Sequence, residues 1–417
     1  MGFHRGSFRP PCWWHQRQGT DACQYRRVPP PPEPDRVART IIKMNLTVLN
    51  VLTLTLVVPL AAAAQGATSW RMADAPILSI GANEEFAGIT SGVFLNDGAF
   101  VIGDVMNARL SVFNSQGRLE KMIGRSGAGP GEFQNLAWAR AYRGDSIATY
   151  DRAQRRVTVF SRSGIRARTV SIASPGNGWG PEALALLDDG RILVQATRAI
   201  GAETAPPGVH VAAMELWLYS AAGAPLNRVA SNLVSMQWVK LASPRLLMPR
   251  PLTVGSLVGL RDSSVFISDS ADAPIREVSV AGIEVRRFGV RSSTRTPSTD
   301  HIAAYRESQL ATARRSNDAN ALTMQTRILD ATPFPDHVPA FRRLFVDRDG
   351  RLWVQEYPEA RSTRQRFRVY APDGRLLANA IGPTDGRVFD VRGTQALVAW
   401  TDPDGVPYVR VYAIQAK

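Results

Sequence analysis

The chain has 417 residues, of which 44% are hydrophobic and 21% are charged, as in a globular protein with a large core. Its formal net charge is +14, and residues 1–43, with eight Lys/Arg and three Asp/Glu, supply +5 of that. The other basic residues are nearly all arginines scattered along the chain. A nucleic-acid-binding surface requires clustered positive charge, so this distribution argues against nucleic acid as a partner.

The N-terminal segments are expected to lie outside the folded body. Residues 1–43 have no hydrophobic periodicity and include a run of prolines, so we interpret them as an over-long translation start or a disordered leader. Residues 44–64 follow basic residues, are apolar and end in alanines, which predicts a secretory signal peptide cleaved after Ala64. The alternative is a retained membrane anchor, although a span requires about 20 apolar residues. Cleavage predicts an exported protein, periplasmic or secreted, with no membrane span.

Cysteine and histidine patterns favour neither a disulfide framework nor a zinc site. Both cysteines, Cys12 and Cys23, precede the predicted cleavage site. The remaining histidines, His210, His301 and His337, lie in separate segments and form no H-x-x-x-H motif. The G-x-S-x-G motif of a serine nucleophile is also missing.

A two-strand unit recurs along the rest of the chain. Each copy is an apolar strand, a turn and a second strand, and most copies close with an aromatic residue followed by three residues and a glycine. The closing glycines are Gly117, Gly164, Gly223, Gly282 and Gly374, and a sixth copy ends at the C-terminus. In three copies an aspartate, Asp104, Asp151 or Asp269, stands nine positions before the end of the second strand. Such constancy is typical of a hairpin whose turn fixes the register.

Two further strands complete each unit. One precedes the hairpin, as in "NLAWARAY", and one follows the closing glycine. Four strands repeated six times predict an all-β, six-bladed β-propeller over residues 75–417. The C-terminal "VRVYAIQAK" has no strand after it, whereas "PILSIG" at 76–81 has no hairpin of its own. We therefore expect 76–81 to pair into the last blade, closing the ring and removing exposed edges, and we expect a monomer.

The glycine-rich stretch "IGRSGAGPGEF" (123–133) is interpreted as a turn between blades. Pro130 stands where a Walker loop requires Lys, and Glu132 would repel a phosphate. Gly127, Gly129 and Gly131 are spaced two and two, which does not match G-x-G-x-x-G, and strand-like sequence follows. These glycines are therefore predicted to be structural.

The stretch 123–164, "IGRSGAGPGEFQNLAWARAYRGDSIATYDRAQRRVTVFSRSG", resembles the NHL-type repeat of bacterial six-bladed β-propeller proteins. The shared features are the glycine-rich lead, the strand-ending Asp and the closing glycine. The likeness is weaker at 92–122 and 341–376. The resemblance implies the fold but no single activity, since such proteins include binding scaffolds, lyases and lactonase-like hydrolases.

Two insertions interrupt the repeat. Residues 291–340 are rich in Ala, Leu, Gln and Arg and predict a helical insertion between blades 4 and 5, capped by Thr299 or Asp300. The insertion could be a lid or docking element, or could merely cover the sheet. A smaller insertion at 196–214 interrupts the third hairpin near the same rim.

Candidate site residues were weighed against structural roles. Asp104, Asp151 and Asp269 are expected to accept N–H groups within their turns. The candidate ligand-binding residues are Arg125, Glu132, Trp179, Trp353 and Glu356. For Arg125 and Glu132, a local ion pair that ties the turn is the stronger alternative. Glu356 replaces the turn Asp of its blade, as a site residue would.

The function that these patterns favour is binding rather than catalysis. We expect a scaffold that holds a small ligand, a glycan or a protein partner at the loop-rich face of the channel, with no cofactor. The alternative is a Ca²⁺-assisted lyase or lactonase with carboxylates at the channel mouth. The enzyme hypothesis predicts converging carboxylates without neutralising arginines. The binding hypothesis predicts a pocket lined by aromatic residues or arginines near Trp179, Trp353 and the 291–340 insertion.

Overall fold

The computed structural model describes residues 67–81, 86–269, 274–289, 295–316, 318, 320–384 and 386–416. The predicted leader (1–43) and signal peptide (44–64) lie outside these described residues. Within the described ranges, no helix is both long enough and apolar enough to cross a bilayer.

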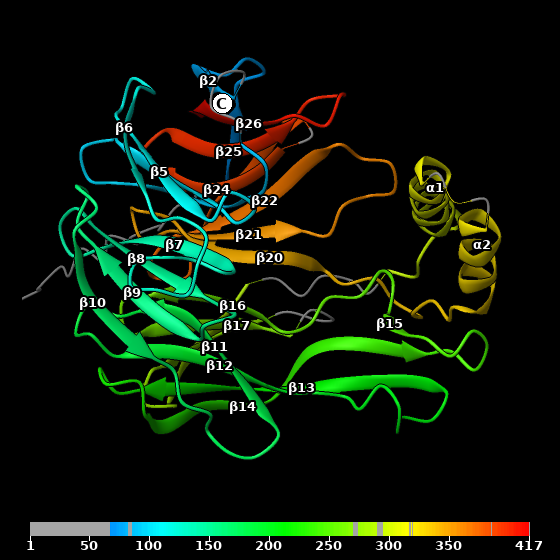
Figure 1. Cartoon of the computed structure of the whole chain (residues 1–417). Coiled ribbons are helices and arrows are strands. Elements are labelled where there is room, and N and C mark those ends of the chain that lie inside the picture. Colours follow the sequence, from blue (N-terminus) through cyan, green and yellow to red (C-terminus); the bar gives the residue numbers. More distant parts are fainter. Residues whose placement is uncertain are drawn as a thin grey trace, which may run out of the picture. The chain divides into compact units, whose positions relative to one another are not determined.

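Antiparallel blades follow one another along the chain (Figure 1). The first strands of the blades surround a central channel. Blade 1 comprises β3 (Ile89–Phe94), β4 (Phe100–Asp104), β5 (Arg109–Phe113) and β6 (Leu119–Ile123). Blade 2 comprises β7 (Leu136–Tyr142), β8 (Ser146–Asp151), β9 (Arg156–Phe160) and β10 (Arg166–Ser171). Blade 3 comprises β11 (Trp179–Leu186), β12 (Ile192–Arg198), β13 (Gly208–Tyr219), β14 (Pro225–Lys240) and the short β15 (Leu247–Pro249).

The remaining blades complete the six-bladed propeller, so the predicted fold is confirmed. Blade 4 comprises β16 (Leu257–Arg261), β17 (Ser264–Ser268), β18 (Ile275–Ser279) and β19 (Glu284–Phe288). Blade 5 comprises β20 (Phe341–Val346), β21 (Leu352–Glu356), β22 (Arg364–Tyr370) and β23 (Leu376–Thr384). Blade 6 comprises β24 (Gly386–Arg392), β25 (Gln395–Thr401), β26 (Pro407–Ala416) and β2 (Leu78–Ile80).

Two N-terminal strands join the last blades. Strand β2 pairs antiparallel with β26, with Leu78 opposite Val411, so the predicted closure of the ring by residues 76–81 is confirmed. Strand β1 (Thr68–Met72) was not predicted. It pairs in parallel with β23 and antiparallel with β26, and thereby links blades 5 and 6 into one sheet. The sequence of β1 matches no part of the repeat, so the repeat could not reveal it.

The backbone conformation of the turn explains why each repeat closes with a glycine. Its backbone lies in the left-handed region, with φ between 78° and 89° in the five copies. An L-residue with a Cβ adopts that region at a cost of about 1 kcal/mol or more. The glycine N–H completes the turn by donating to the carbonyl three residues earlier, as Gly117 does to Asn114 at 2.9 Å.

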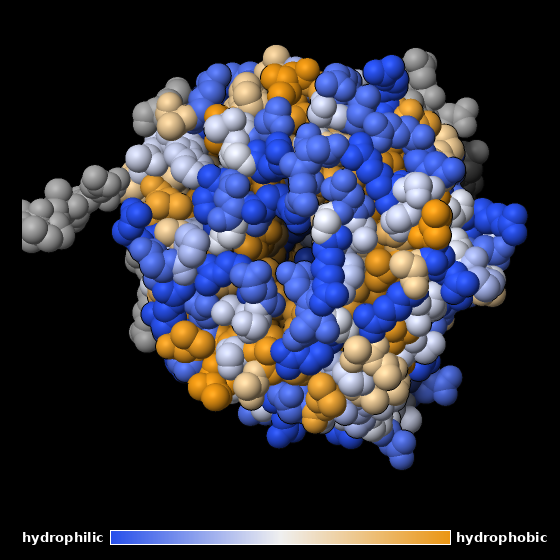
Figure 2. All heavy atoms as spheres, turned by 90° about the vertical axis from the view of Figure 1, so that its left-hand side faces the viewer, coloured by the Kyte–Doolittle hydropathy of each residue, from blue (hydrophilic) through white to orange (hydrophobic). Residues whose placement is uncertain are grey.

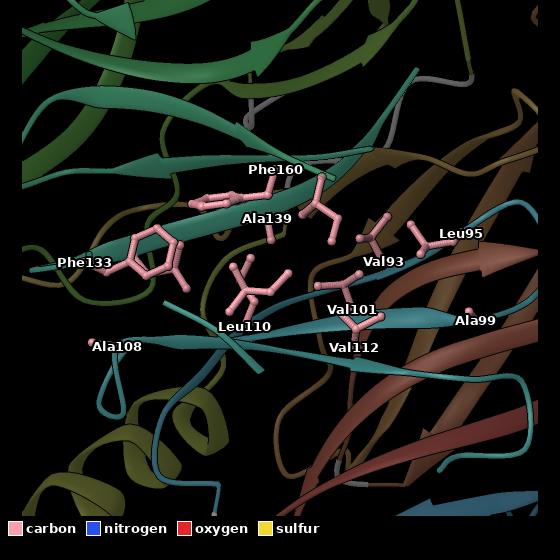
Figure 3. Close-up of a cluster of buried hydrophobic side chains, with 13 residues drawn as sticks. Val93, Leu95, Ala99, Val101, Ala108, Leu110, Val112, Phe133, Ala139 and Phe160 are labelled. Carbon is pink, nitrogen blue, oxygen red and sulfur yellow. The ribbon is translucent and has the colours of Figure 1, made fainter. Parts of the chain in front are cut away.

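The hydrophobic core lies between neighbouring blades. Figure 3 shows the cluster between blades 1 and 2, where strands β4 and β5 face blade 2. Phe133 and Phe160 pack edge-to-face there, with ring centroids 6.0 Å apart. Phe133 is the last residue of the 123–133 stretch, so the aromatic residue after the glycines anchors the turn in the core. A turn with no helix after it leads from β6 to β7.

The large insertion contains α1 (Thr299–Arg315) and α2 (Ala321–Ala331), between β19 and β20, as predicted. The N-cap is Ser298, whose hydroxyl accepts the His301 N–H, rather than Thr299 or Asp300. In the segment 196–214, β13 begins at Gly208 and runs unbroken, so β13 and β14 form a hairpin that extends beyond the blade. Figure 1 shows this extension on the same side as α1 and α2.

Candidate functional site

A cavity of about 840 Å³ opens between blades 5 and 6, where strands β20, β22 and β24 begin. Six arginines line it, together with two glutamates and no lysine. We call it the arginine pocket; its arginines are Arg342, Arg343, Arg361, Arg364, Arg366 and Arg387. The glutamates are Glu356 and Glu359.

The starts of β20, β22 and β24 bring these arginines together, and β20 and β22 each have a register shift there. In β22, "RQRFRVY", Phe367 is buried while Arg364 and Arg366 are exposed, because successive side chains of a strand point to opposite faces. Arg342 and Arg343 stand at the start of β20, and Arg387 at the start of β24. The loop between β21 and β22 adds Arg361. Its φ of 62° places an arginine in the left-handed region that side chains rarely adopt.

Both glutamates of the arginine pocket are engaged by arginines that do not line it. Arg368 Nε donates to Glu356 at 2.8 Å, and Arg295 donates to Glu359 at 2.5 Å. Arg364, one of the six, pairs with Asp74 at 3.2 Å. Local carboxylates therefore do not neutralise the other five guanidinium groups.

Arg343 is held by the neighbouring blade. Its guanidinium donates to the main-chain carbonyl of Val388 and lies 4.9 Å from the Phe345 ring centroid. Burial, followed by the nearby charges of Arg387 and Arg140, lowers the pKa of Arg343 to about 9. Burial and then the charge of Arg342 also lower the pKa of Arg387. Crowded like charges in a partly desolvated site favour the binding of an anion.

The other four arginines make fewer contacts. Arg342, Arg361, Arg366 and Arg387 form no side-chain hydrogen bond or ion pair with the residues that the structure describes. Each presents a planar guanidinium with five N–H donors. This part of the pocket therefore holds an excess of strong, unused donors.

The arginine pocket adjoins the central channel, because Arg343 and Arg387 line both. The channel has a volume of about 670 Å³ and is lined by the first strand of each blade. Figure 2 shows the face opposite α1 and α2, which is hollowed near its centre and largely hydrophilic around the hollow. Turn residues Asp188, Asp262 and Gly350 line the channel at the ends of these strands.

Two of the four carboxylates that line the channel, Asp390 and Asp347, are engaged by donors. Asp390 accepts the main-chain N–H groups of Phe94 and Val391 at 3.0 and 2.9 Å, and burial raises its pKa to about 7. Asp347 accepts from Arg351 Nε at 2.6 Å and from the Trp353 indole at 2.7 Å. Burial raises the pKa of Asp347 despite these donors.

These residues do not fit the Ca²⁺ site that the sequence left open. Such a site requires several oxygen ligands that converge on one point. Among the described residues, no group of three or more His, Cys, Asp or Glu side chains converges in that way. The channel also has five arginines for its four aspartates.

Of the predicted ligand residues, Glu356 lies in the arginine pocket and the others do not. Arg125 and Glu132 form an ion pair of 2.8 Å on the connection between blades 1 and 2. The Gly129 N–H at 2.7 Å and then Arg125 lower the pKa of Glu132. The Trp179 ring is half-buried, with the Arg198 guanidinium 5.6 Å from its centroid.

Trp353 is 0% exposed and lies in the core between blades 5 and 6. It stacks on Phe345 and meets Phe367 edge-on, at centroid distances of 5.9 and 5.6 Å. Residues of blade 6, such as Val388 and Val398, belong to the same buried cluster. The residue therefore packs the core rather than lining a cavity.

The turn aspartates make the following contacts. Asp104 accepts the N–H groups of Ala87, Gly88 and Asn107 at 3.0, 2.9 and 3.2 Å. Asp151 accepts those of Gln134, Asn135 and Gln154 at 2.7, 3.0 and 2.9 Å. Both thus tie the hairpin turn to the connection that enters the blade. Asp269 is exposed, accepts from the Ser256 hydroxyl at 2.8 Å and lies 3.7 Å from Arg276, while the turn at 270–273 lies outside the described residues.

The predicted structural glycines surround the Glu132 side chain. Gly127 and Gly131 have φ of 151° and 82°. A Cβ at Gly127 would stand 2.1 Å from the Glu132 carboxylate, and one at Gly129 would stand 2.8 Å from it. The turn therefore requires small residues where the carboxylate folds back onto it.

Comparisons with known proteins agree with this architecture. A family model described as a 6-bladed beta-propeller (DUF5128) matches residues 83–172. No curated protein matches the chain.

Similar solved structures share the fold at low sequence identity. A Bacteroides fragilis protein described as exported is 12% identical, with 84% of this chain and 95% of that one covered and a TM-score of 0.45. A duf4221 family member from Bacteroides vulgatus is 10% identical, with 84% and 99% covered and a TM-score of 0.47. A gluconolactonase from Xanthomonas campestris is 14% identical, with 81% and 89% covered and a TM-score of 0.42. These likenesses assign no activity to the chain.

Proposed function

We propose that this protein is an exported binding scaffold that holds an anionic ligand in the arginine pocket. The observation that carries the proposal is a set of four guanidinium groups that form no hydrogen bond or ion pair with the described residues. One of them, Arg387, lies 5.0 Å from the Phe389 ring centroid. The two glutamates beside them are engaged by other arginines. Like charges brought together on a rigid frame repel each other, and an anion that enters relieves the repulsion. The pocket volume of about 840 Å³ is that of a small-molecule site.

Binding fits the pocket better than metal-assisted catalysis. A lyase or lactonase of that class needs a cation held by converging carboxylates to polarise a carbonyl. Both glutamates of the pocket, and Asp347 and Asp390 of the channel, instead accept hydrogen bonds from arginines, an indole or main-chain N–H groups. The arginines that remain favour holding an acidic ligand over holding a cation.

The proposed export rests on the apolar segment 44–64 and on the lack of cysteine after it. Expression of the full chain in a bacterium, followed by fractionation and intact mass measurement, tests this. We expect a periplasmic product that begins at Gln65. A cytoplasmic product that retains residues 1–64 would contradict export.

We further propose that the blades are NHL-type repeats. The glycine-rich lead and the closing glycine of residues 123–164 support this assignment. The test is to align homologous sequences blade by blade. Absence of this pattern from the aligned blades would contradict the assignment.

Calorimetric titration tests the binding function. The purified protein is titrated with citrate, tripolyphosphate, hexaglutamate and acidic oligosaccharides at low and at high ionic strength. The matched variants are R342A/R366A, which removes two pocket arginines, and R287A/R375A, which removes two exposed arginines outside the pocket. Both double variants lower the net charge by the same amount, so they separate a specific site from general attraction.

We expect one anion class to bind at a single site and to bind more weakly at high salt. R342A/R366A should weaken it about 100-fold, since a hydrogen bond to a charged group contributes roughly 1.5–3 kcal/mol. R287A/R375A should bind like the wild type. If no anion binds, or if both double variants weaken binding equally, the proposed function is wrong.

A further inference from the structure

We infer that the ligand of the arginine pocket is an acidic oligosaccharide, a short chain of sugar residues that carry carboxylates. The inference rests on the proposed function and adds the chemical class of the ligand. It follows from the spread of the charges, the type of cation and the neutral groups between them.

The four guanidinium groups without a hydrogen bond or ion pair are spread over separate parts of the pocket wall. Arg342 lies on β20, Arg366 on β22 and Arg387 on β24, and Arg361 lies on the loop after β21. Strands β20 and β24 are the first strands of different blades. A compact anion such as inorganic phosphate meets only part of such a wall. A ligand with negative charges repeated along its length can meet all of it.

The volume agrees with an extended ligand. Drug-sized molecules occupy pockets of roughly 300–1,000 Å³, and the arginine pocket, at about 840 Å³, lies in the upper part of that range. It therefore has room for several sugar rings. The channel continues from it past Arg343 and Arg387, which line both spaces.

The type of cation favours carboxylates. All six basic residues of the pocket are arginines, whose planar fork binds a carboxylate through two parallel hydrogen bonds. Arginine also binds phosphate in this way, but protein phosphate sites typically add main-chain N–H groups from a helix N-terminus or a glycine-rich nest. Neither helix of the insertion contributes a residue to the pocket, and its one glycine, Gly386, is a strand residue.

Neutral polar groups lie among the arginines, as recognition of sugar hydroxyls requires. Gln355 donates to Gln365 at 3.1 Å, which leaves the oxygen of the first amide and the amino group of the second without a partner among the described residues. The hydroxyls of Thr363 and Thr401 also line the pocket. Amide and hydroxyl groups both donate and accept, so they can pair with hydroxyls in either direction.

An acidic peptide is the competing ligand, and the lining favours it less. A bound peptide usually places apolar side chains in apolar pockets. Here the non-polar lining is limited to Ile89, Pro358, Ala399 and the ring of Tyr357. The ring can stack against a sugar face, as aromatic side chains with one polar end do.

The loop that carries Arg361 is fixed to the helical insertion. Arg295 pairs with Glu359 and donates to the Tyr357 carbonyl at 3.1 Å, and His301 Nε2 lies 3.3 Å from the Pro358 carbonyl. Three contacts on consecutive loop residues set the position of the arginine that follows. The insertion therefore shapes one wall of the pocket.

The experiment compares ligand classes of matched length and charge by calorimetry. The acidic sugars are oligomers of galacturonate, of the mannuronate and guluronate of alginate, and of hyaluronan. The comparators are neutral galactose oligomers, hexaglutamate and tripolyphosphate. Wild type, R342A/R366A and R287A/R375A are each titrated.

We expect at least one acidic sugar to bind at least tenfold more tightly than the comparators. R342A/R366A should lose about 100-fold in affinity, and R287A/R375A should lose nothing. If hexaglutamate or tripolyphosphate binds more tightly than all three acidic sugars, the sugar class is wrong while anion binding stands. If nothing binds, or if the pocket variant binds like the wild type, the inference and the proposed function both fail.

Discussion

Blade 4 and the arginine pocket use the same residue type in opposite ways. In blade 4, Glu277 is almost fully buried and accepts from Arg261 at 3.0 Å and from Arg286 at 2.6 Å. In the arginine pocket, four arginines have no such partner among the described residues. A buried charge with its counter-charge in place contributes to the fold, whereas unmatched charges on a rigid wall remain available for a ligand.

The largest loss of stability is expected when the buried ion pairs of Glu277 in blade 4 are broken. E277A leaves two arginines without their carboxylate, and loss of one partner of a buried ion pair typically destabilises by about 3–5 kcal/mol. We expect a decrease of about 3 kcal/mol in the free energy of unfolding, measured by urea denaturation. E284A is the control, because Glu284 pairs with Arg287 on the surface of the same blade. It should change stability by less than about 1 kcal/mol. If E277A and E284A destabilise the protein equally, the distinction between buried and surface ion pairs is wrong.

The second prediction concerns Asp390, a buried carboxyl group that accepts hydrogen bonds from main-chain N–H groups. Burial raises its pKa to about 7 in the folded chain, above the ordinary 3.8. Between roughly pH 4 and pH 7 the folded chain therefore keeps a proton that the unfolded chain has released. The contribution of Asp390 to the free energy of unfolding consequently falls as the pH rises through this window and is constant above it.

The D390N variant removes this titration. In the wild type, Asp390 should lower the free energy of unfolding by a few kcal/mol between pH 4.5 and pH 8, since one pKa unit corresponds to about 1.4 kcal/mol. D390N should lack this decrease. The measurement is chemical denaturation across that range. Identical pH profiles for the wild type and D390N would show that Asp390 does not carry the effect.

A smaller effect is expected at the rim of the arginine pocket. E359Q weakens the ion pair with Arg295, which is partly exposed on both sides. Such pairs contribute at most about 1 kcal/mol to stability. The variant should unfold almost like the wild type and bind the ligand a few-fold more weakly, because the loop that carries Arg361 loosens. Unchanged affinity in the calorimeter would show that the contact does not position Arg361.

The sequence revealed most of the fold because the fold repeats. The closing glycines occupy the same left-handed turn in each copy, and Asp104 and Asp151 make equivalent contacts in neighbouring blades. Strand β1 could not be found in this way. It follows no repeat and pairs with strands that are more than 300 residues away in the sequence.

The site could be predicted only in general terms. The binding hypothesis predicted a pocket lined by aromatic residues or arginines near Trp179, Trp353 and the insertion. The arginine pocket contains neither tryptophan, and Glu356 is its one residue among the predicted ligand residues. The sequence does carry a signal for the arginine pocket. In "RQRFRVY" and "AFRRLF", arginines alternate with or adjoin buried aromatic residues. The arginines are scattered in the sequence because they converge from different blades only in three dimensions. Trp353 proved to be a core residue, since the sequence does not reveal that blade 6 packs against this face of β21.

The most direct measurement is to determine stability and ligand affinity together in R342A/R366A. The central claim is that these arginines serve a ligand and not the fold. We predict a free energy of unfolding within about 0.5 kcal/mol of the wild type, as for surface substitutions without a structural partner, and an affinity for acidic oligosaccharide about 100-fold weaker. A variant that unfolds far more easily, or one that binds the oligosaccharide as tightly as the wild type, would contradict the claim.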